Sequence, residues 1–370
     1  MASALKDQFG DEVIRRLGSE IAGVYKPFKR TAFERDARLG FGMLELLDRG
    51  RHLGTVLHRY LPEQFADAVD VLLATLPATR DAAGGMSSFF YLPHTEFIRA
   101  HGLPHFDDSM RGLYALTQRF TGEFALRPFL AERTSETLEQ LQIWTMDPSD
   151  HVRRLVSEAT RPRLPWAPRL RIFQKDPHPV LYLLAQLRED SSLYVRRSVA
   201  NNLNDIGKDH PALLVQTAAE WMRDASVERR WVVQHALRSS VKKGDPAALA
   251  VLGFSATTRL TVLDSTFKPA RPRMGSKVVV TVALTNPTRV TQRAVVDLLV
   301  HFVKSNGGVG IKVFKLSTVE LAPRGSIELR KTVSLADLTT RRHYPGEHKV
   351  DVQINGVATP IGSFHVLPSR

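Results

Sequence analysis

The chain contains no cysteine, and this absence excludes several kinds of chemistry. Disulfide frameworks, thiol catalysis, zinc ribbons and iron–sulfur clusters all need cysteine side chains. Long apolar runs are also missing, because no stretch approaches the roughly 18 residues of a membrane span. The first 15 residues mix charges and lack the apolar core of an export signal. We therefore expect a protein of a reducing cytosol that is not exported.

Positive charge is distributed unevenly along the 370 residues. The chain carries 51 Lys and Arg against 38 Asp and Glu, a formal charge of +13. Residues 255–370 hold +10 of this excess and residues 1–254 only +3. Such a basic region is typical of proteins that bind a polyanion, because neutralised phosphates release condensed counterions. The alternative is that the basic surface serves solubility alone.

The spacing of apolar residues changes near Gly253. Upstream, apolar side chains recur at helical spacing, as they do in residues 65–72. Downstream, they recur at a period of two, as at Val350, Val352 and Ile354, and turn signals separate the strand candidates. These patterns predict a multidomain protein, α-helical first and then a β-sandwich.

A diffuse repeat runs through the helical part. A segment of about ten residues that begins at Asp147 returns at Asp190 and, one residue shorter, at Asp224. Its Arg pairs are 43 and then 33 residues apart, a spacing typical of HEAT-like helical pairs that stack into a solenoid. Each opening Asp is suited to capping a helix, and Pro148 stands at the expected first helical position.

Helical projection separates an apolar stripe from a charged face in the first two copies. Arg154, Glu158 and Arg161 share the charged face of the first helix. In the second copy Arg197 and Asp205 project away from the stripe. Such charges are usually solvated ion pairs worth about 0.3 kcal/mol. Their occurrence on two adjacent repeats instead favours a shared groove.

The connection after the first copy, residues 161–169, holds Trp166 among arginines and three prolines. Proline stiffens the chain, and an aromatic plane beside arginines is suited to binding nucleic acid. The alternative is that Trp166 fills the gap between two repeats.

Three segments, residues 150–170, 194–208 and 230–238, resemble the AlkC-type DNA glycosylases. These enzymes belong to the AlkC/AlkD superfamily of HEAT-like alkylation-repair proteins, and one subgroup carries a C-terminal immunoglobulin-like domain. The resemblance covers essentially the whole chain. It implies a HEAT-like α-helical solenoid as the catalytic domain, residues 1–254, and an immunoglobulin-like β-sandwich as a DNA-binding domain, residues 255–370.

The same resemblance implies base excision repair: hydrolysis of the N-glycosidic bond of 3-methyladenine and 3-methylcytosine in double-stranded DNA. The family's acidic positions fall on Glu123, Glu158 and Asp205, which are expected to be catalytic. The expected DNA-binding residues are Arg154, Arg161, Trp166, Arg197, Arg230 and Arg238. His235 stands where AlkD-type relatives have an aromatic residue. We expect a monomer of the bacterial cytosol that acts on the nucleoid and has no membrane partner.

The chemistry agrees with these residue types. A base alkylated at N3 is already cationic and leaves without a general acid, so the difficult step is to stabilise an oxocarbenium-like sugar. One carboxylate near C1′ offsets the developing charge, and a second orients or deprotonates the attacking water. This needs no metal and no cofactor, and the chain has no HExxH-like spacing. We place Glu158 and Asp205 nearest the sugar and Glu123 at the groove edge.

Two other classes of function remain open. One is a non-catalytic HEAT-like module that binds damaged or branched DNA and tolerates loss of the carboxylates. The other is a protein-binding scaffold, for which a solenoid is also suited.

Overall fold

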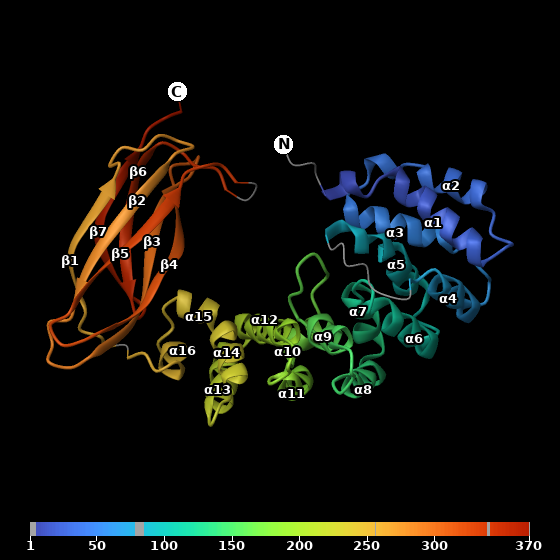
Figure 1. The fold of residues 1–370 in the computed structure, drawn as a ribbon, viewed down its shortest axis with the longest axis horizontal. Helices are drawn as coiled ribbons and strands as arrows, with labels where there is room; N and C mark the ends of the chain where they lie inside the picture. The colour runs from blue at the N-terminus through green and yellow to red at the C-terminus, as the bar shows by residue number, and fades with distance from the viewer. Residues whose placement is uncertain (1–4, 78–84, 256, 339–340, 370) are drawn as a thin grey trace. The chain divides into compact units, whose positions relative to one another are not determined.

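The computed structural model describes residues 5–77, 85–255, 257–338 and 341–369 (Figure 1). The chain divides into two compact units, Met1–Pro211 with Ala225–Ala236, and Ala212–Asp224 with Leu237–Arg370. The first unit is helical, and the second combines helices with a β-sandwich. The predicted order of α and then β is therefore confirmed, while a domain boundary at residue 254 stays a prediction.

The helical unit contains the following elements. In chain order they are η1 (Leu5–Gln8), α1 (Asp11–Val24), α2 (Arg30–Arg38), η2 (Phe41–Met43), α3 (Leu46–Leu57), α4 (Phe65–Ala74), η3 (Gly85–Tyr91), α5 (Leu92–His101), α6 (Phe106–Thr117), α7 (Glu123–Glu132), α8 (Thr134–Trp144), α9 (Asp150–Ala159), α10 (Arg171–Lys175), α11 (His178–Leu187), α12 (Leu193–Asp209) and α14 (Val227–Ala236). In the described ranges no helix is long and apolar enough to cross a membrane.

Helices α7, α9, α12 and α14 pack against one another in series, and α8 and α11 pack on one side of this series, below it in Figure 1. The apolar stripes predicted from the sequence make these contacts. Val152, Leu155 and Val156 of α9 are fully buried, as are Val195 and Val199 of α12. This stacking is the predicted HEAT-like solenoid, and it leaves the charged faces of α9 and α12 on the opposite side.

Serine occupies the N-cap position of the repeat helices where aspartate was predicted, and its side chain makes no capping hydrogen bond there. Ser149 and Ser192 are the N-cap residues of α9 and α12. Asp147 and Asp190 instead accept hydrogen bonds at 2.8 Å from the backbone N–H groups of those serines. The prediction that Pro148 opens the first helix is wrong, because this Asx turn moves the helix start two residues further on.

The third copy of the repeat aligns with the others without a deletion. In each copy an arginine donates to a carbonyl of the turn that precedes the helix. The pairs are Arg153 with Pro148 at 3.0 Å, Arg196 with Ser191 at 2.9 Å and Arg230 with Ala225 at 3.3 Å. Arg230 therefore corresponds to Arg153 rather than to Arg154, and the predicted shortening of the third copy is wrong.

The second unit contains α13 (Pro211–Met222), α15 (Arg238–Lys242), α16 (Pro246–Val251), β1 (Thr261–Lys268), β2 (Lys277–Thr285), β3 (Gln292–Val303), β4 (Val309–Leu321), β5 (Ser326–Ser334), β6 (Gly346–Ile354) and β7 (Val357–Val366). The strands form two antiparallel sheets with the orders β1-β2-β5 and β4-β3-β6-β7. Alternate residues such as Val280, Val296 and Val350 point inward and form one apolar core. The predicted immunoglobulin-like β-sandwich is confirmed.

A close backbone contact ties the turn before α16 to the β6–β7 turn. Gly244 and Gly356 have positive φ angles of 76° and 86°. A Cβ added to Gly244 would lie only 2.6 Å from the Cα of Gly356, so both positions require glycine. Asn355 supports the contact by donating to the Ser255 carbonyl at 2.7 Å.

Candidate active site

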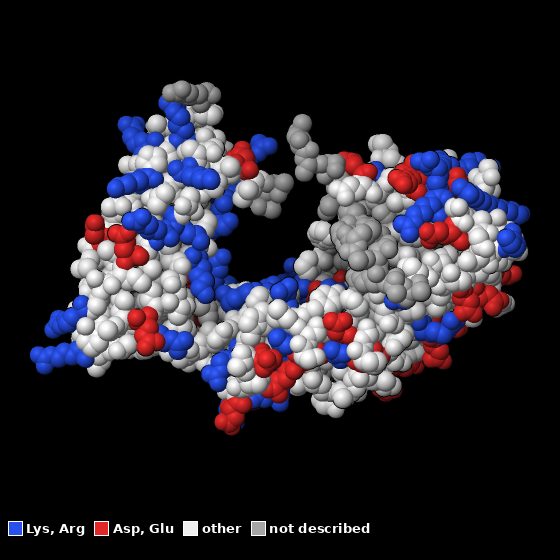
Figure 2. All heavy atoms as spheres, in the orientation of Figure 1, with Lys and Arg blue, Asp and Glu red and all other residues white. Residues whose placement is uncertain are grey.

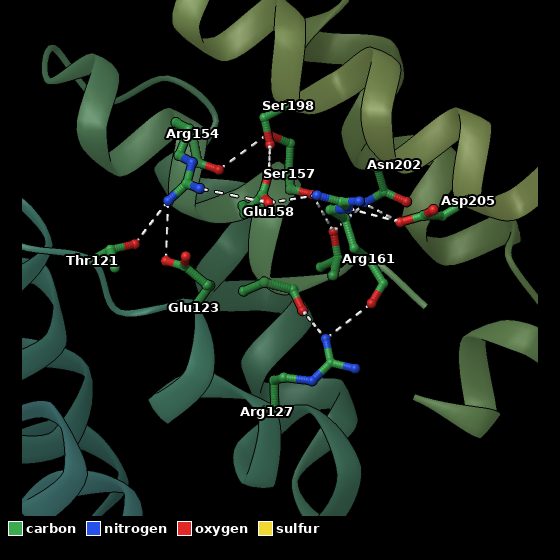
Figure 3. A network of polar contacts seen from close by, with 12 residues as sticks. Thr121, Glu123, Arg127, Arg154, Ser157, Glu158, Arg161, Ser198, Asn202 and Asp205 are labelled. Carbon is green, nitrogen blue, oxygen red and sulfur yellow. Dashed lines mark hydrogen bonds and ion pairs between the residues drawn. The ribbon is translucent and has the colours of Figure 1, made fainter. Parts of the chain in front are cut away.

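Helices α9 and α12 bring two predicted acids to one arginine (Figure 3). Arg161, which follows α9, donates through Nη1 to Glu158 Oε1 at 2.7 Å and through Nε to Asp205 Oδ2 at 2.8 Å. The exposed fractions of Glu158, Arg161 and Asp205 are 7%, 9% and 1%. Lys208, one turn after Asp205, donates to its Oδ1 at 2.6 Å. The two ion pairs of Arg161 are therefore buried, unlike the solvated pairs that such spacing usually produces, while Lys208 is itself exposed.

Glu123, the first residue of α7, reaches the same network from another helix (Figure 3). Arg154 Nη1 donates to Glu123 Oε2 at 3.0 Å and to Thr121 Oγ1 at 2.8 Å. Arg154 Nη2 lies 3.6 Å from Glu158 Oε1. The guanidinium carbon of Arg154 also lies 5.3 Å from the centre of the Tyr194 ring. Arg154 thus joins the acids of α7 and α9, and the structure brings together all three predicted catalytic carboxylates.

Burial and the neighbouring arginines shift the pKa values of Glu123 and Glu158 in opposite directions. Burial raises the pKa of Glu123, and the charge of Arg154 offsets only part of this effect. Burial by itself would raise the pKa of Glu158 as well. The charges of Arg154 and Arg161 outweigh this effect and hold the pKa of Glu158 below its ordinary value. Glu158 is therefore a fixed anion near neutral pH, and Glu123 takes up a proton more readily.

The sequence analysis missed Ser198, which orients Glu158. Ser198 Oγ donates to Glu158 Oε2 at 2.6 Å, while Arg161 occupies the other carboxylate oxygen. Ser198 is buried in α12 three residues after Val195, in the direction of the apolar stripe. A polar residue at this spacing is the sequence signal that could have identified it.

The sequence analysis also missed Lys208 and Asn202. Lys208 lies in the last turn of α12, where a cation is ordinary, so its position in the sequence gives no signal of a site. Asn202 Nδ2 donates to the Ser157 carbonyl at 2.8 Å and to Thr160 Oγ1 at 3.0 Å. It therefore ties α12 to the C-terminal end of α9, beside the acids.

The loop after α9 presents Trp166 to solvent. The Trp166 residue is 68% exposed and its φ angle is 65°. Arg163 holds the base of the loop through a two-pronged ion pair with Asp209, with Nε 2.8 Å from Oδ2. Leu164 and Leu170 anchor the loop through buried side chains. Trp166 therefore does not fill the gap between repeats.

The remaining predicted DNA-binding arginines, Arg197, Arg230 and Arg238, lie outside the network of Glu123, Glu158 and Asp205. Arg197 is exposed on α12, and Arg230 is exposed on α14 while it holds the Ala225 carbonyl. Arg238 is the first residue of α15, in the other compact unit. His235 stacks on Trp231 with ring centres 5.0 Å apart and planes 7° apart. A DNA-binding role for these three arginines stays a prediction.

The carboxylates of the site are paired with cationic side chains of the protein. Across the part of the chain that the structure describes, no group of three or more His, Cys, Asp or Glu side chains is placed to hold a metal ion. Arg154, Arg161 and Lys208 instead supply the positive charge around the carboxylates.

Comparison with known proteins identifies the family. The family model described as the C-terminal Ig-like domain of the uncharacterised protein YhaZ matches residues 261–368. The uncharacterised protein YhaZ of Bacillus subtilis strain 168 is 35% identical over 363 residues, which cover 98% of this chain and 99% of YhaZ. A solved structure of Pseudomonas fluorescens alkylpurine DNA glycosylase AlkC, bound to DNA containing an abasic site analogue, is 35% identical with a TM-score of 0.91. That similarity covers 99% of this chain and 100% of the AlkC chain. The chain therefore belongs to the AlkC-type DNA glycosylase family, in the subgroup with a C-terminal immunoglobulin-like domain.

Proposed function

We propose that this chain is a DNA repair glycosylase that hydrolyses the N-glycosidic bond of N3-alkylated bases, 3-methyladenine and 3-methylcytosine, in double-stranded DNA. The observation that carries the proposal is a buried carboxylate, Glu158, kept ionised by Arg154 and Arg161 in a strongly basic chain. The similarity to an alkylpurine DNA glycosylase solved with DNA supports the assignment of substrate class.

The reaction that we propose needs little proton transfer to the base. The glycosidic bond between C1′ and the cationic base breaks heterolytically, and the base leaves as a neutral molecule. The positive charge that develops on the sugar is offset by the anion of Glu158, which Arg161 and Ser198 hold in one orientation. Asp205 is the second acid: it orients the water that adds at C1′ and accepts the proton that this water loses. Glu123 assists at the edge of the groove.

Asp205 is well suited to a fixed position. Its Oδ2 accepts from Arg161, and its Oδ1 accepts from Lys208. Two cations on one buried carboxylate keep its geometry constant while charge develops nearby, so no reorganisation is needed during bond cleavage.

We further propose that the basic β-sandwich binds DNA phosphates and that the protein exposes the lesion by bending the duplex. In Figure 2 Lys and Arg are more prominent than Asp and Glu on the visible face of the sandwich. Arg271 and Arg273 are exposed between β1 and β2. Their joint replacement by Glu should weaken binding to duplex DNA and make the salt dependence shallower. Unchanged affinity and salt slope would show that these two arginines face water only.

Base release from methylated duplex DNA tests the proposed activity. We expect release by the wild type and a loss of at least tenfold in Glu158→Gln, which keeps the shape of the side chain and removes its charge. Glu139→Gln is the matched control, since Glu139 is an exposed glutamate of α8. Binding of damaged or branched DNA without any release by the wild type would instead support the non-catalytic DNA-binding module.

A further inference from the structure

Arg127 is a buried cation whose hydrogen bonds all go to backbone carbonyls. It lies in the second turn of α7 and is only 4% exposed. Its Nη1 donates to the carbonyls of Ala159 at 3.1 Å and Arg161 at 2.9 Å, and its Nε donates to that of Pro168 at 3.0 Å. Its Nη2 donates to the Pro168 carbonyl as well. One guanidinium thus joins the end of α9, a contact drawn in Figure 3, to Pro168 at the far end of the loop that carries Trp166.

The electrostatic surroundings of Arg127 are unfavourable for a residue that serves stability alone. Among the residues that the structure describes, no carboxylate forms an ion pair with Arg127. Burial, and then the nearby charge of Arg161, lower the pKa of Arg127 to about 10. A second cation is therefore kept next to the arginine that bridges Glu158 and Asp205, at an energetic cost.

The position of Arg127 connects the three catalytic acids. It lies four residues after Glu123 on α7, so the two side chains project from neighbouring turns of one face. It also fixes the backbone of Arg161, whose side chain holds the other two acids. We propose that Arg127 is a positioning residue that fixes α7 and Arg161 in the relative positions that catalysis needs. This proposal rests on the proposed glycosylase function.

Arg49 provides a matched control within the same unit. It lies in α3, is 7% exposed, and likewise donates only to backbone carbonyls. Its partners are Leu44 at 3.0 Å, Lys6 at 2.6 Å, Phe9 at 2.9 Å and Gly42 at 3.4 Å. Loss of Arg49 therefore removes the same kind of contact, far along the chain from the acids.

The test compares Arg127→Lys and Arg127→Gln with Arg49→Lys and Arg49→Gln in the full chain. The readout is the single-turnover rate of base release at saturating enzyme, with folding followed by circular dichroism. We expect a loss of about a hundredfold for both Arg127 variants, because small misplacements of reacting groups have effects of this size. The Arg49 variants should keep the wild-type rate within about twofold, at equal or greater loss of thermal stability.

A rescue experiment separates positioning from a general folding defect. A cavity of about 260 Å³ is lined by Arg127, Trp166 and Pro168, so a small cation can enter where the side chain is removed. In Arg127→Ala, guanidinium at low millimolar concentration should raise the single-turnover rate of base release at least about tenfold over the rate without guanidinium. Sodium at equal ionic strength should not raise it.

Each outcome decides the proposal. Equal rates for the Arg127 and Arg49 variants would overturn it, and so would Arg127 variants that do not fold while the Arg49 variants do, since Arg127 would then serve stability. Failure of guanidinium to restore any rate in folded Arg127→Ala also counts against it. A wild type that releases no base is a different result, because it removes the proposed function itself.

Discussion

Arg161 and Asp205, 44 positions apart in the sequence, form a two-pronged ion pair in which Nε and Nη2 of the arginine each lie 2.8 Å from Oδ2 of the aspartate. The two residues come from consecutive helical repeats, and both are buried. Because Arg161 also holds Glu158, a single side chain neutralises two acids inside the protein. The pairing therefore links the stability of the solenoid to the charge state of the site.

Replacement of Arg161 by Met should destabilise the protein in a pH-dependent way. Glu158 and Asp205 each lose one of their two cations, so the pKa of Glu158 rises in the folded state and stability is lost as pH rises through that pKa. We expect the free energy of unfolding to fall by about 3 kcal/mol at pH 7 and by less at pH 4.5. Urea denaturation at both pH values measures this.

Arg163→Met is the control for that experiment, since Arg163 forms a similar but more exposed pair with Asp209. Its effect should be no more than about 1 kcal/mol. Equal losses for the two variants would contradict the special position of Arg161.

Ser198→Ala should slow base release while leaving the fold intact. The variant removes the hydroxyl that donates to Glu158 Oε2, which frees the carboxylate to rotate and raises its pKa. We expect a tenfold lower single-turnover rate, roughly the effect of one hydrogen bond to a charged group. Ser191→Ala, at an exposed turn position, should behave as wild type. A wild-type rate in Ser198→Ala would mean that the arginines alone orient Glu158.

The pH dependence of the rate should depend on Glu123. Burial raises the pKa of Glu123, so this acid is protonated over a wider range below neutrality than an ordinary glutamate. If its anion assists catalysis, the wild-type rate increases with pH through that raised pKa. The Glu123→Gln variant should lose this inflection and be slower on the alkaline side. Persistence of the same inflection in Glu123→Gln would assign it to another group.

Asp297 in β3 should lower the stability of the sandwich at neutral pH. Burial raises the pKa of Asp297 to about 6, with Lys315 and Lys242 opposing the effect. The folded state binds this proton more tightly than the unfolded state, so stability falls as pH rises between about 4 and 6. Asp297→Asn should therefore be more stable than wild type by up to about 2 kcal/mol above pH 6, with no gain near pH 4. Thermal unfolding across this range checks the prediction, and a gain that does not vary with pH would contradict it.

Much of the fold could be predicted because each element carries its own periodic signal. Val152, Leu155 and Val156 mark the buried face of α9 from local spacing alone, and Val350 and Val352 do the same for β6. Helix starts were placed less well, since aspartate and serine both cap helices and only the Asx turn at Asp147 distinguishes them.

The candidate site could be predicted only in part, because its contacts join residues far apart in the chain. The acids were identified through family resemblance, and the shared face of Glu158 and Arg161 followed from helical spacing. Ser198 and Arg127 were not found, since their partners lie 40 and 34 residues away and depend on how repeats stack. The spacing of Ser198 relative to Val195 indicates that it is buried, but it does not reveal which acid the serine contacts.

The tethered loop after α9 has a consequence for the affinity of the protein. Arg127 holds its carbonyls and Arg163 holds its base, while Trp166 stands exposed at its tip. A loop already held in one conformation loses little freedom when a ligand arrives, so more of the contact energy of the indole is retained as binding free energy. We therefore expect Trp166, if it contacts DNA as predicted, to do so without an induced-fit step.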